Sequence, residues 1–99
     1  MIRKKRTPSS KRWYLYIIEC RTKELYIGIS NDVKARVNKH NQGKACRYTK
    51  YRHPVRLLYT EYCGDMSAAR LRENEVKRFP REKKLEMVYA KRREEFLGF

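Results

Sequence analysis

The 99 residues, 40% of them apolar, can close around one small hydrophobic core, and they exclude a second domain. Because no apolar run approaches the roughly 20 residues that cross a bilayer and the basic N-terminus lacks a secretory apolar segment, we expect a soluble, cytoplasmic protein. The 26 Lys and Arg against 11 Asp and Glu leave a net charge of +15, which favours nucleic acid as the partner over an anionic membrane or an unliganded basic surface.

The first segment, residues 1–12, is strongly basic and contains no acidic residue. Nothing in it could anchor to a core, so we expect a disordered arm that either adds phosphate contacts or only increases solubility. Three cysteines follow further along the chain. Because Cys20, Cys46 and Cys63 are odd in number and form no CxxC pair, they predict reduced structural thiols rather than a disulfide framework or a zinc site.

A β-hairpin is predicted next. Trp13 to Cys20 is apolar at nearly every position, which is typical of a strand covered on both faces, and Leu25 to Ile29 is the return strand. Gly28 inside the second strand indicates a bulge or a group lying close to the backbone, and a phosphate could be that group.

The register of this hairpin decides whether Tyr16 and Tyr26 can act together. Residues that lie opposite each other in an antiparallel pair share a face of the sheet. A loop of two or four residues would place the two tyrosines on opposite faces. A loop of three or five residues, or a bulge near Gly28, would place them on the same face.

A helix is predicted from Ser30 or Asn31, either of which could be its N-cap, to about residue 41, before Gly43. Within it Arg36 and His40 share one helical stripe with two valines. An arginine on an apolar stripe either extends its charged end to solvent or holds its charge at a partly shielded site, and we favour the second interpretation.

The basic segment from Gly43 to Tyr51 is predicted to be a loop or irregular helix. Its cations could meet backbone phosphates while Tyr48 packs or stacks on a base, although an ordinary polar connection fits as well. The residues predicted to bind nucleic acid here are Lys44, Arg47, Tyr48, Lys50 and Arg52, together with Gly28 and Ser30.

A third strand is predicted from Val55 to about Cys63, following Pro54. Strict alternation would turn Val55, Leu57 and Tyr59 to one face of the sheet and Leu58, Thr60 and Tyr62 to the other.

Two helices follow, the first from a cap at Asp65 or Ser67 to about Phe79, and the second from Arg81 to about Phe96. The expected apolar stripe of the first consists of Ala68, Ala69, Leu71, Val76 and Phe79. Glu73 falls at the edge of this stripe and Glu75 inside it, so periodicity does not choose between the two carboxylates.

An ordered set of residues runs through all of these elements. It comprises Tyr16, Tyr26-Ile27-Gly28, Ser30, Arg36, His40-Asn41, Tyr48-Thr49, Pro54, Ala69, Glu73 and Val76-Lys77. The set resembles the GIY-YIG nuclease domain, in particular the small stand-alone bacterial proteins that contain it. The first tripeptide here reads YLY instead of GIY, and Ile29 stands where some family members have a lysine.

The resemblance implies an α/β (α+β) fold: a single domain with a three-stranded antiparallel sheet flanked by helices. We expect this domain at residues 13–88, followed by a C-terminal helical extension at 89–99. It also implies the catalytic residues, which are Tyr16, Tyr26, Arg36, His40 and Glu73, and it selects Glu73 as the metal ligand. One of the two tyrosines would be the general base, and the choice between them stays open.

A tyrosine with its free pKa of about 10 acts as a base only where cationic charge favours the phenolate. Arg36 and a metal could supply that charge, and His40 could accept the phenolic proton. A single carboxylate, Glu73, suits one Mg²⁺ or Mn²⁺ that binds only together with the substrate.

We therefore expect a monomeric, metal-dependent endonuclease that acts on branched, nicked or damaged DNA, with no small-molecule substrate and no membrane partner. The alternative is a nucleic-acid-binding protein, for RNA as well as DNA, that keeps the nuclease fold with little or no turnover. A basic scaffold without a catalytic role is the third hypothesis.

Overall fold

The computed structural model describes residues 12–97. The elements in chain order are β1 (Trp13–Glu19), β2 (Leu25–Ser30), α1 (Val33–Asn41), α2 (Arg47–Lys50), β3 (Arg56–Gly64), α3 (Met66–Lys77) and α4 (Arg81–Leu97). No helix within residues 12–97 has the length and apolar character that crossing a membrane requires. The predicted arm at residues 1–12 lies outside the described part of the chain except for Arg12, and the predicted boundary at residue 89 falls within α4.

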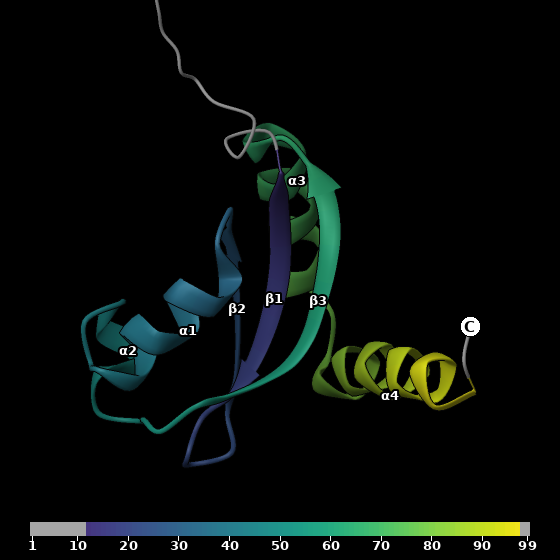
Figure 1. Ribbon diagram of the computed structural model, residues 1–99. Helices are drawn as coiled ribbons and strands as arrows, with labels where there is room; N and C mark the ends of the chain where they lie inside the picture. Colours follow the sequence, from purple (N-terminus) through teal and green to yellow (C-terminus); the bar gives the residue numbers. More distant parts are fainter. Residues whose placement is uncertain (1–11, 98–99) are drawn as a thin grey trace, which may run out of the picture.

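The sheet has three antiparallel strands in the order β2-β1-β3, which confirms the predicted fold class (Figure 1). Five residues, 20–24, connect β1 to β2, and Lys23 in this turn has a φ of 83°. Tyr26 lies opposite Ile18, and Tyr16 lies opposite Gly28. Because residues two apart on a strand point to the same side, Tyr16 and Tyr26 share a face of the sheet.

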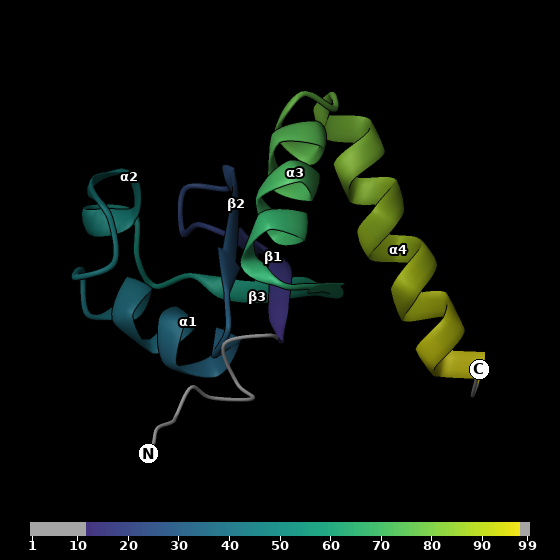
Figure 2. The same cartoon turned by 90° about the horizontal axis from the view of Figure 1, so that it is seen from above.

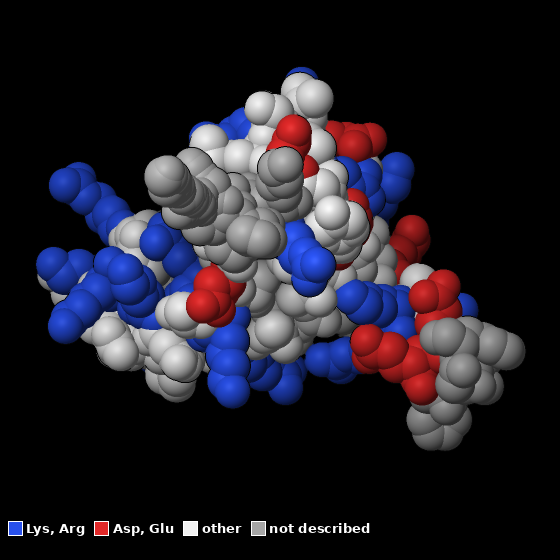
Figure 3. Space-filling view, turned by 45° about the horizontal axis from the view of Figure 1, so that its top comes forward, with Lys and Arg blue, Asp and Glu red and all other residues white. Residues whose placement is uncertain are grey.

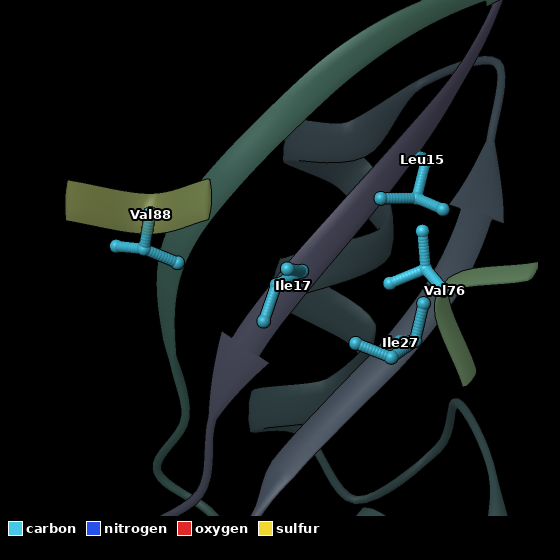
Figure 4. Packing of buried hydrophobic residues seen from close by; sticks show 5 residues of the cluster. All are labelled: Leu15, Ile17, Ile27, Val76 and Val88. Carbon is cyan, nitrogen blue, oxygen red and sulfur yellow. The ribbon is translucent and has the colours of Figure 1, made fainter. Parts of the chain in front are cut away.

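One face of the sheet packs against α3 and α4. Leu15 and Ile17 of β1 and Ile27 of β2 lie against Val76 of α3 and Val88 of α4, and all five side chains are at most 3% exposed (Figure 4). Seen from above, α3 covers this face and α4 lies beside it (Figure 2). This is the main apolar core.

The opposite face carries a second cluster, formed by Tyr16, Ile18, Cys20 and Val55. Val33 and Val37 of α1 pack against it, so α1 and α2 lie on the other side of the sheet from α3 (Figures 1 and 2). Apolar contacts on both faces explain why nearly every residue of β1 is apolar.

Strand β3 differs from the strict alternation predicted for it. Tyr59 lies opposite Ile17 and Leu57 lies opposite Ile18, so Leu58 is an extra residue at a bulge. Leu57 and Tyr59 therefore point to opposite faces, and the prediction that they share one was wrong. The bulge allows Leu58 and Tyr59 to pack against the main core together.

The helix starts also correct the sequence prediction in detail. The N-cap of α1 is Asp32, whose carboxylate accepts a hydrogen bond from the Ala35 amide, and not Ser30 or Asn31. Asp65 caps α3 through the Ala68 amide, as one of the two predicted caps. Leu71 was assigned to the apolar stripe of this helix, but it is 72% exposed.

The two glutamates of α3 separate clearly in the structure. Glu73 is buried, whereas Glu75 is exposed and pairs with Arg72, whose Nη1 lies 2.8 Å from a Glu75 oxygen. Arg72 also binds Glu61 of β3, with 2.7 Å between Arg72 Nε and Glu61 Oε2. Glu75 thus belongs to an ion-pair network that ties α3 to β3, and Glu73 does not.

Candidate active site

An open cleft of about 380 Å³ lies along β2, an edge strand of the sheet. Four of the five predicted catalytic residues line it: Tyr16 of β1, Tyr26 of β2, Arg36 of α1 and Glu73 of α3. The fifth, His40, lies behind Tyr16 and is completely buried. Residues from helices on both sides of the sheet, α1 and α3, therefore line the same cleft.

Tyr16 connects the cleft to the interior. Its hydroxyl lies 2.9 Å from His40 Nε2, and the side chain is almost completely buried. Burial raises the pKa of Tyr16, while a hydrogen bond from Arg36 and the charge of that guanidinium act in the opposite direction. Burial dominates, so Tyr16 carries its proton in the free protein and can donate it to His40.

His40 is held from both sides by hydrogen bonds. Nε2 faces the Tyr16 hydroxyl, and Nδ1 lies 2.7 Å from Thr49 Oγ1. Burial, together with the nearby charge of Arg36, lowers the pKa of His40 to about 4. The imidazole is therefore neutral at physiological pH, with one ring nitrogen that donates and one that accepts.

Tyr26 occupies a different environment on the same face. Its ring centroid lies 6.5 Å from that of Tyr16 and stacks at 5.8 Å on Tyr48. Burial raises its pKa, and a hydrogen bond with Cys46 acts in the same direction. In contrast to Tyr16, Tyr26 therefore interacts with a thiol and an aromatic ring rather than with an imidazole nitrogen.

Arg36 is half-buried and lines the cleft, although it belongs to the same helical stripe as Val33 and Val37. Its Nη2 donates a long hydrogen bond, 3.4 Å, to the Ala45 carbonyl. The guanidinium is held at a partly shielded position. This agrees with the interpretation favoured from the sequence, in which the charge of Arg36 is kept at a shielded site and does not extend to solvent. Its positive charge acts against the burial effect on the pKa of Tyr16 and adds to the burial effect on the pKa of His40.

Glu73 lines the cleft with its carboxylate, which forms ion pairs with two basic side chains of the same helix, α3. Its oxygens lie 3.2 Å from Lys77 Nζ and 4.0 Å from Arg70 Nε. Among residues 12–97, no three His, Cys, Asp or Glu side chains converge as a metal site. One hard oxygen donor does not fit zinc, but it fits Mg²⁺ or Mn²⁺, which accept phosphate and water oxygens as their other ligands.

Gly28 leaves space for another group close to the backbone, and the sequence analysis suggested that this group could be a phosphate. A Cβ atom at Gly28 would lie 2.4 Å from both Cζ and the hydroxyl oxygen of Tyr16. The group that lies against Gly28 is therefore the Tyr16 ring. Gly28 still lines the cleft, as does Ser30, whose hydroxyl accepts a hydrogen bond from the Asp32 amide.

The predicted nucleic-acid-binding residues of the α1–α2 region divide into two groups, and none of them lines the cleft. Lys44, Arg47 and Lys50 are exposed. Tyr48 and Arg52 interact within the protein, since the Arg52 guanidinium lies 4.2 Å from the Tyr48 ring and donates to the Tyr48 carbonyl. Figure 3 shows Lys and Arg gathered on the side of α1 and α2, and most visible acidic side chains on the other side.

The sequence analysis placed several residues that surround the cleft outside the candidate site. Trp13, Asn31 and Arg70 line the cleft, and Thr49 and Cys46 extend the hydrogen bonds of His40. Arg70 precedes Glu73 by three residues, a spacing that could have indicated a shared helix face. Thr49 was part of the ordered set, but no local pattern connects it to His40.

The chain is similar to several known proteins. Residues 12–86 match the family described as the GIY-YIG catalytic domain. The chain is similar to a UPF0213 protein of Staphylococcus saprophyticus, with 44% identity over 76% of this chain and 92% of that protein. A UPF0213 protein of Staphylococcus haemolyticus is 45% identical over the same shares.

One solved structure is also similar. It is the solution NMR structure of the UPF0213 protein BH0048 from Bacillus halodurans. The identity is 39%, the match covers 81% of this chain and 85% of the other, and the TM-score is 0.53.

Proposed function

This chain belongs to the GIY-YIG family, and from that premise we propose that it is a metal-dependent endonuclease that hydrolyses phosphodiester bonds in DNA. One observation carries the proposal. The Tyr16 hydroxyl lies 2.9 Å from His40 Nε2 at the wall of a cleft that Arg36 and Glu73 also line. Side chains suited to act as a base, as a proton acceptor behind it, as a cation for phosphate and as a carboxylate for a metal ion thus lie close together, which supports the proposal.

Tyr16 is the general base in this proposal, because it alone of the two tyrosines contacts His40 through a ring nitrogen. A water oxygen bonds to phosphorus as the bond to the leaving oxygen breaks. The water proton passes to the Tyr16 oxygen, while the Tyr16 proton passes to His40 Nε2. The leaving oxygen takes its proton from solvent.

Arg36 makes this proton transfer easier once the substrate is bound. In the free protein its positive charge lowers the pKa of His40. A phosphate in the cleft would accept hydrogen bonds from the guanidinium and offset that charge, so that His40 gains proton affinity when it is needed. The same side chain orients the scissile phosphate, and its two-pronged geometry is one that lysine lacks.

Glu73 would hold a single Mg²⁺ or Mn²⁺, which when bound would stabilise the charge that develops on the phosphate and the leaving oxygen. In the free protein, the Glu73 carboxylate already forms ion pairs with Lys77 and Arg70. We therefore expect the ion to bind with the substrate, whose phosphate supplies further oxygen ligands.

The preferred substrates in this proposal are branched, nicked or damaged forms of DNA. Sequence-specific DNA interfaces bury about 1,000–2,500 Å² of protein surface, and single small modules bury less. A 99-residue chain has little surface for reading a long sequence, so recognition of a DNA shape is favoured.

Glu73→Ala tests the proposal. The variant should lose metal-dependent cleavage of plasmid and of branched DNA in Mg²⁺ or Mn²⁺, while binding of a labelled duplex stays close to wild type. Glu75→Ala is the matched control, because Glu75 lies on the same helix but is exposed and pairs with Arg72. Equal loss of binding and cleavage in Glu73→Ala would argue for a purely structural glutamate.

A second function, nucleic-acid binding with little or no turnover, is favoured by the ion pairs of Glu73, which occupy its carboxylate in the free protein. Under this hypothesis the wild-type chain binds DNA or RNA but releases no product from plasmid, single strands or junctions, with either metal.

A further inference from the structure

A row of polar side chains leads away from the cleft, from His40 through Thr49 to Cys46. The catalytic steps proposed above use only His40. Thr49 on α2 is completely buried, and its hydroxyl lies 2.7 Å from His40 Nδ1. The same hydroxyl lies 3.4 Å from the Cys46 sulfur. The hydrogen bonds of this row can be given directions.

The directions follow from the Tyr16 end of the row. Tyr16 is almost completely buried, so its own proton needs an acceptor, and His40 Nε2 lies 2.9 Å away. Nε2 is therefore the unprotonated nitrogen of the neutral ring.

The proton of neutral His40 must then be on Nδ1, where it points to Thr49 Oγ1. A threonine hydroxyl that accepts this bond keeps its own hydrogen for another partner, and the Cys46 sulfur is within reach. The sequence of donors therefore runs without a conflict from Tyr16 through His40 and Thr49 to Cys46.

We propose that Thr49 is a positioning residue that holds His40 in the tautomer protonated at Nδ1, which leaves Nε2 free to accept the Tyr16 proton. This inference rests on the proposed nuclease function only for its catalytic consequence. The opposite tautomer would place a second proton between His40 and Tyr16. Tyr16 could then not pass its own proton to the ring.

Under this proposal, the single turn of α2 keeps Thr49 in position during proton transfer. When Nε2 receives the Tyr16 proton, both ring nitrogens carry hydrogen and the ring becomes positive. The Nδ1–H bond to Thr49 is unchanged in that step, so no side chain has to reorient during proton transfer. Contacts of Arg52 with the ring and carbonyl of Tyr48 hold this turn in place next to Thr49.

The first test reads the tautomer directly, without any activity. Long-range ¹H–¹⁵N NMR spectra distinguish protonated from unprotonated ring nitrogens, and the chain has only two histidines. Wild-type protein and Thr49→Ser should show protonated Nδ1 and unprotonated Nε2 at His40. Thr49→Val keeps the shape without the acceptor and should populate the Nε2-protonated form. Backbone amide spectra of each variant report whether the fold is kept.

The second test is cleavage of the best DNA substrate. Thr49→Val should cut roughly 5- to 30-fold more slowly, the factor that corresponds to loss of one buried hydrogen bond, and Thr49→Ser should restore most of the rate. Duplex binding should not change in either variant.

Two results would overturn the positioning role: an unchanged His40 tautomer in folded Thr49→Val, or a serine variant as impaired as the valine variant. If the wild-type protein cleaves nothing, the proposed function fails, and the NMR spectra alone still decide the role of Thr49.

Discussion

At the scale of the residue, the site depends on a close fit between Tyr16 and its neighbours. The ring lies over Gly28, the hydroxyl reaches His40, and Arg36 stands beside it. Each of these side chains is polar or charged, yet Tyr16 and His40 are buried as deeply as the apolar core. Burial keeps His40 neutral and Tyr16 protonated in the free protein, and both states are what the proposed proton transfer starts from.

Burial of neutral His40 should make stability depend on pH. Its pKa is about 4 in the folded protein and about 6.5 when exposed, so between these values the unfolded chain binds a proton that the folded chain does not. Stability should be at its full value above about pH 6.5 and fall towards pH 4, by about 3 kcal/mol in total. Urea unfolding across this range measures it.

The comparison for this prediction is His40→Gln, which cannot titrate. It should be less stable than wild type at neutral pH, because a buried hydrogen-bonded side chain is replaced, but its stability should fall less steeply on acidification. Identical slopes for the two proteins would show that other groups, and not His40, determine the acid sensitivity.

At the scale of the element, the β1–β2 hairpin decides whether a site can exist. Its five-residue connection, 20–24, sets a register in which Tyr16 lies opposite Gly28 and Tyr26 opposite Ile18. A slip by one residue would move one tyrosine to the face covered by α3. The hairpin therefore carries the two tyrosines as a unit, and the missing side chain of Gly28 provides the space for the ring opposite.

Gly28→Ala should destabilise the hairpin, because the new methyl group would overlap Tyr16 Cζ and its hydroxyl oxygen at 2.4 Å. We expect a loss of about 1–3 kcal/mol in the free energy of unfolding, together with displacement of the Tyr16 hydroxyl from His40. Urea unfolding of a double-mutant cycle measures this. In a Tyr16→Ala background the Gly28→Ala change should cost much less, and an equal cost in both backgrounds would place the clash elsewhere.

At the scale of the whole molecule, charge is distributed unevenly. Residues 33–60 contain eight Lys and Arg and no Asp or Glu. These residues form α1, α2 and the start of β3, and Figure 3 shows the resulting gathering of basic side chains on that side. Three glutamates that follow this segment, Glu61, Glu73 and Glu75, instead pair with arginines of α3. The side that carries α1 and α2 is the one suited to a nucleic-acid backbone.

Replacing Lys44, Arg47 and Lys50 together by Gln should weaken duplex binding and make it less sensitive to salt. If all three contact phosphates, the slope of log K against log[salt] should fall by roughly 2 to 3, since each contact contributes about 0.9. The matched control is Arg81, Arg92 and Arg93 to Gln, which removes the same charge from exposed positions of α4. Equal effects of the two triple variants would mean that net charge alone, and not this surface, governs binding.

Much of the fold could be predicted from the sequence because its signals are local. The apolar run of β1, the turn that follows, the stripe of Val33 and Val37, and the cap at Asp65 each depend on residues within one element. The ordered set from Tyr16 to Glu73 predicted five side chains at one site. Four of them line the cleft, whereas the fifth, His40, lies buried behind Tyr16.

Contacts between segments that are far apart in the chain were decided only by the tertiary structure. The bulge at Leu58, the burial of Glu73 but not Glu75, the ring that lies against Gly28 and the bond between His40 and Thr49 each depend on a partner from another element. Periodicity shows which face a residue occupies but not which group it meets there. The sequence thus determined the elements and the set of reactive side chains, and packing decided which hydrogen bonds and ion pairs those side chains form.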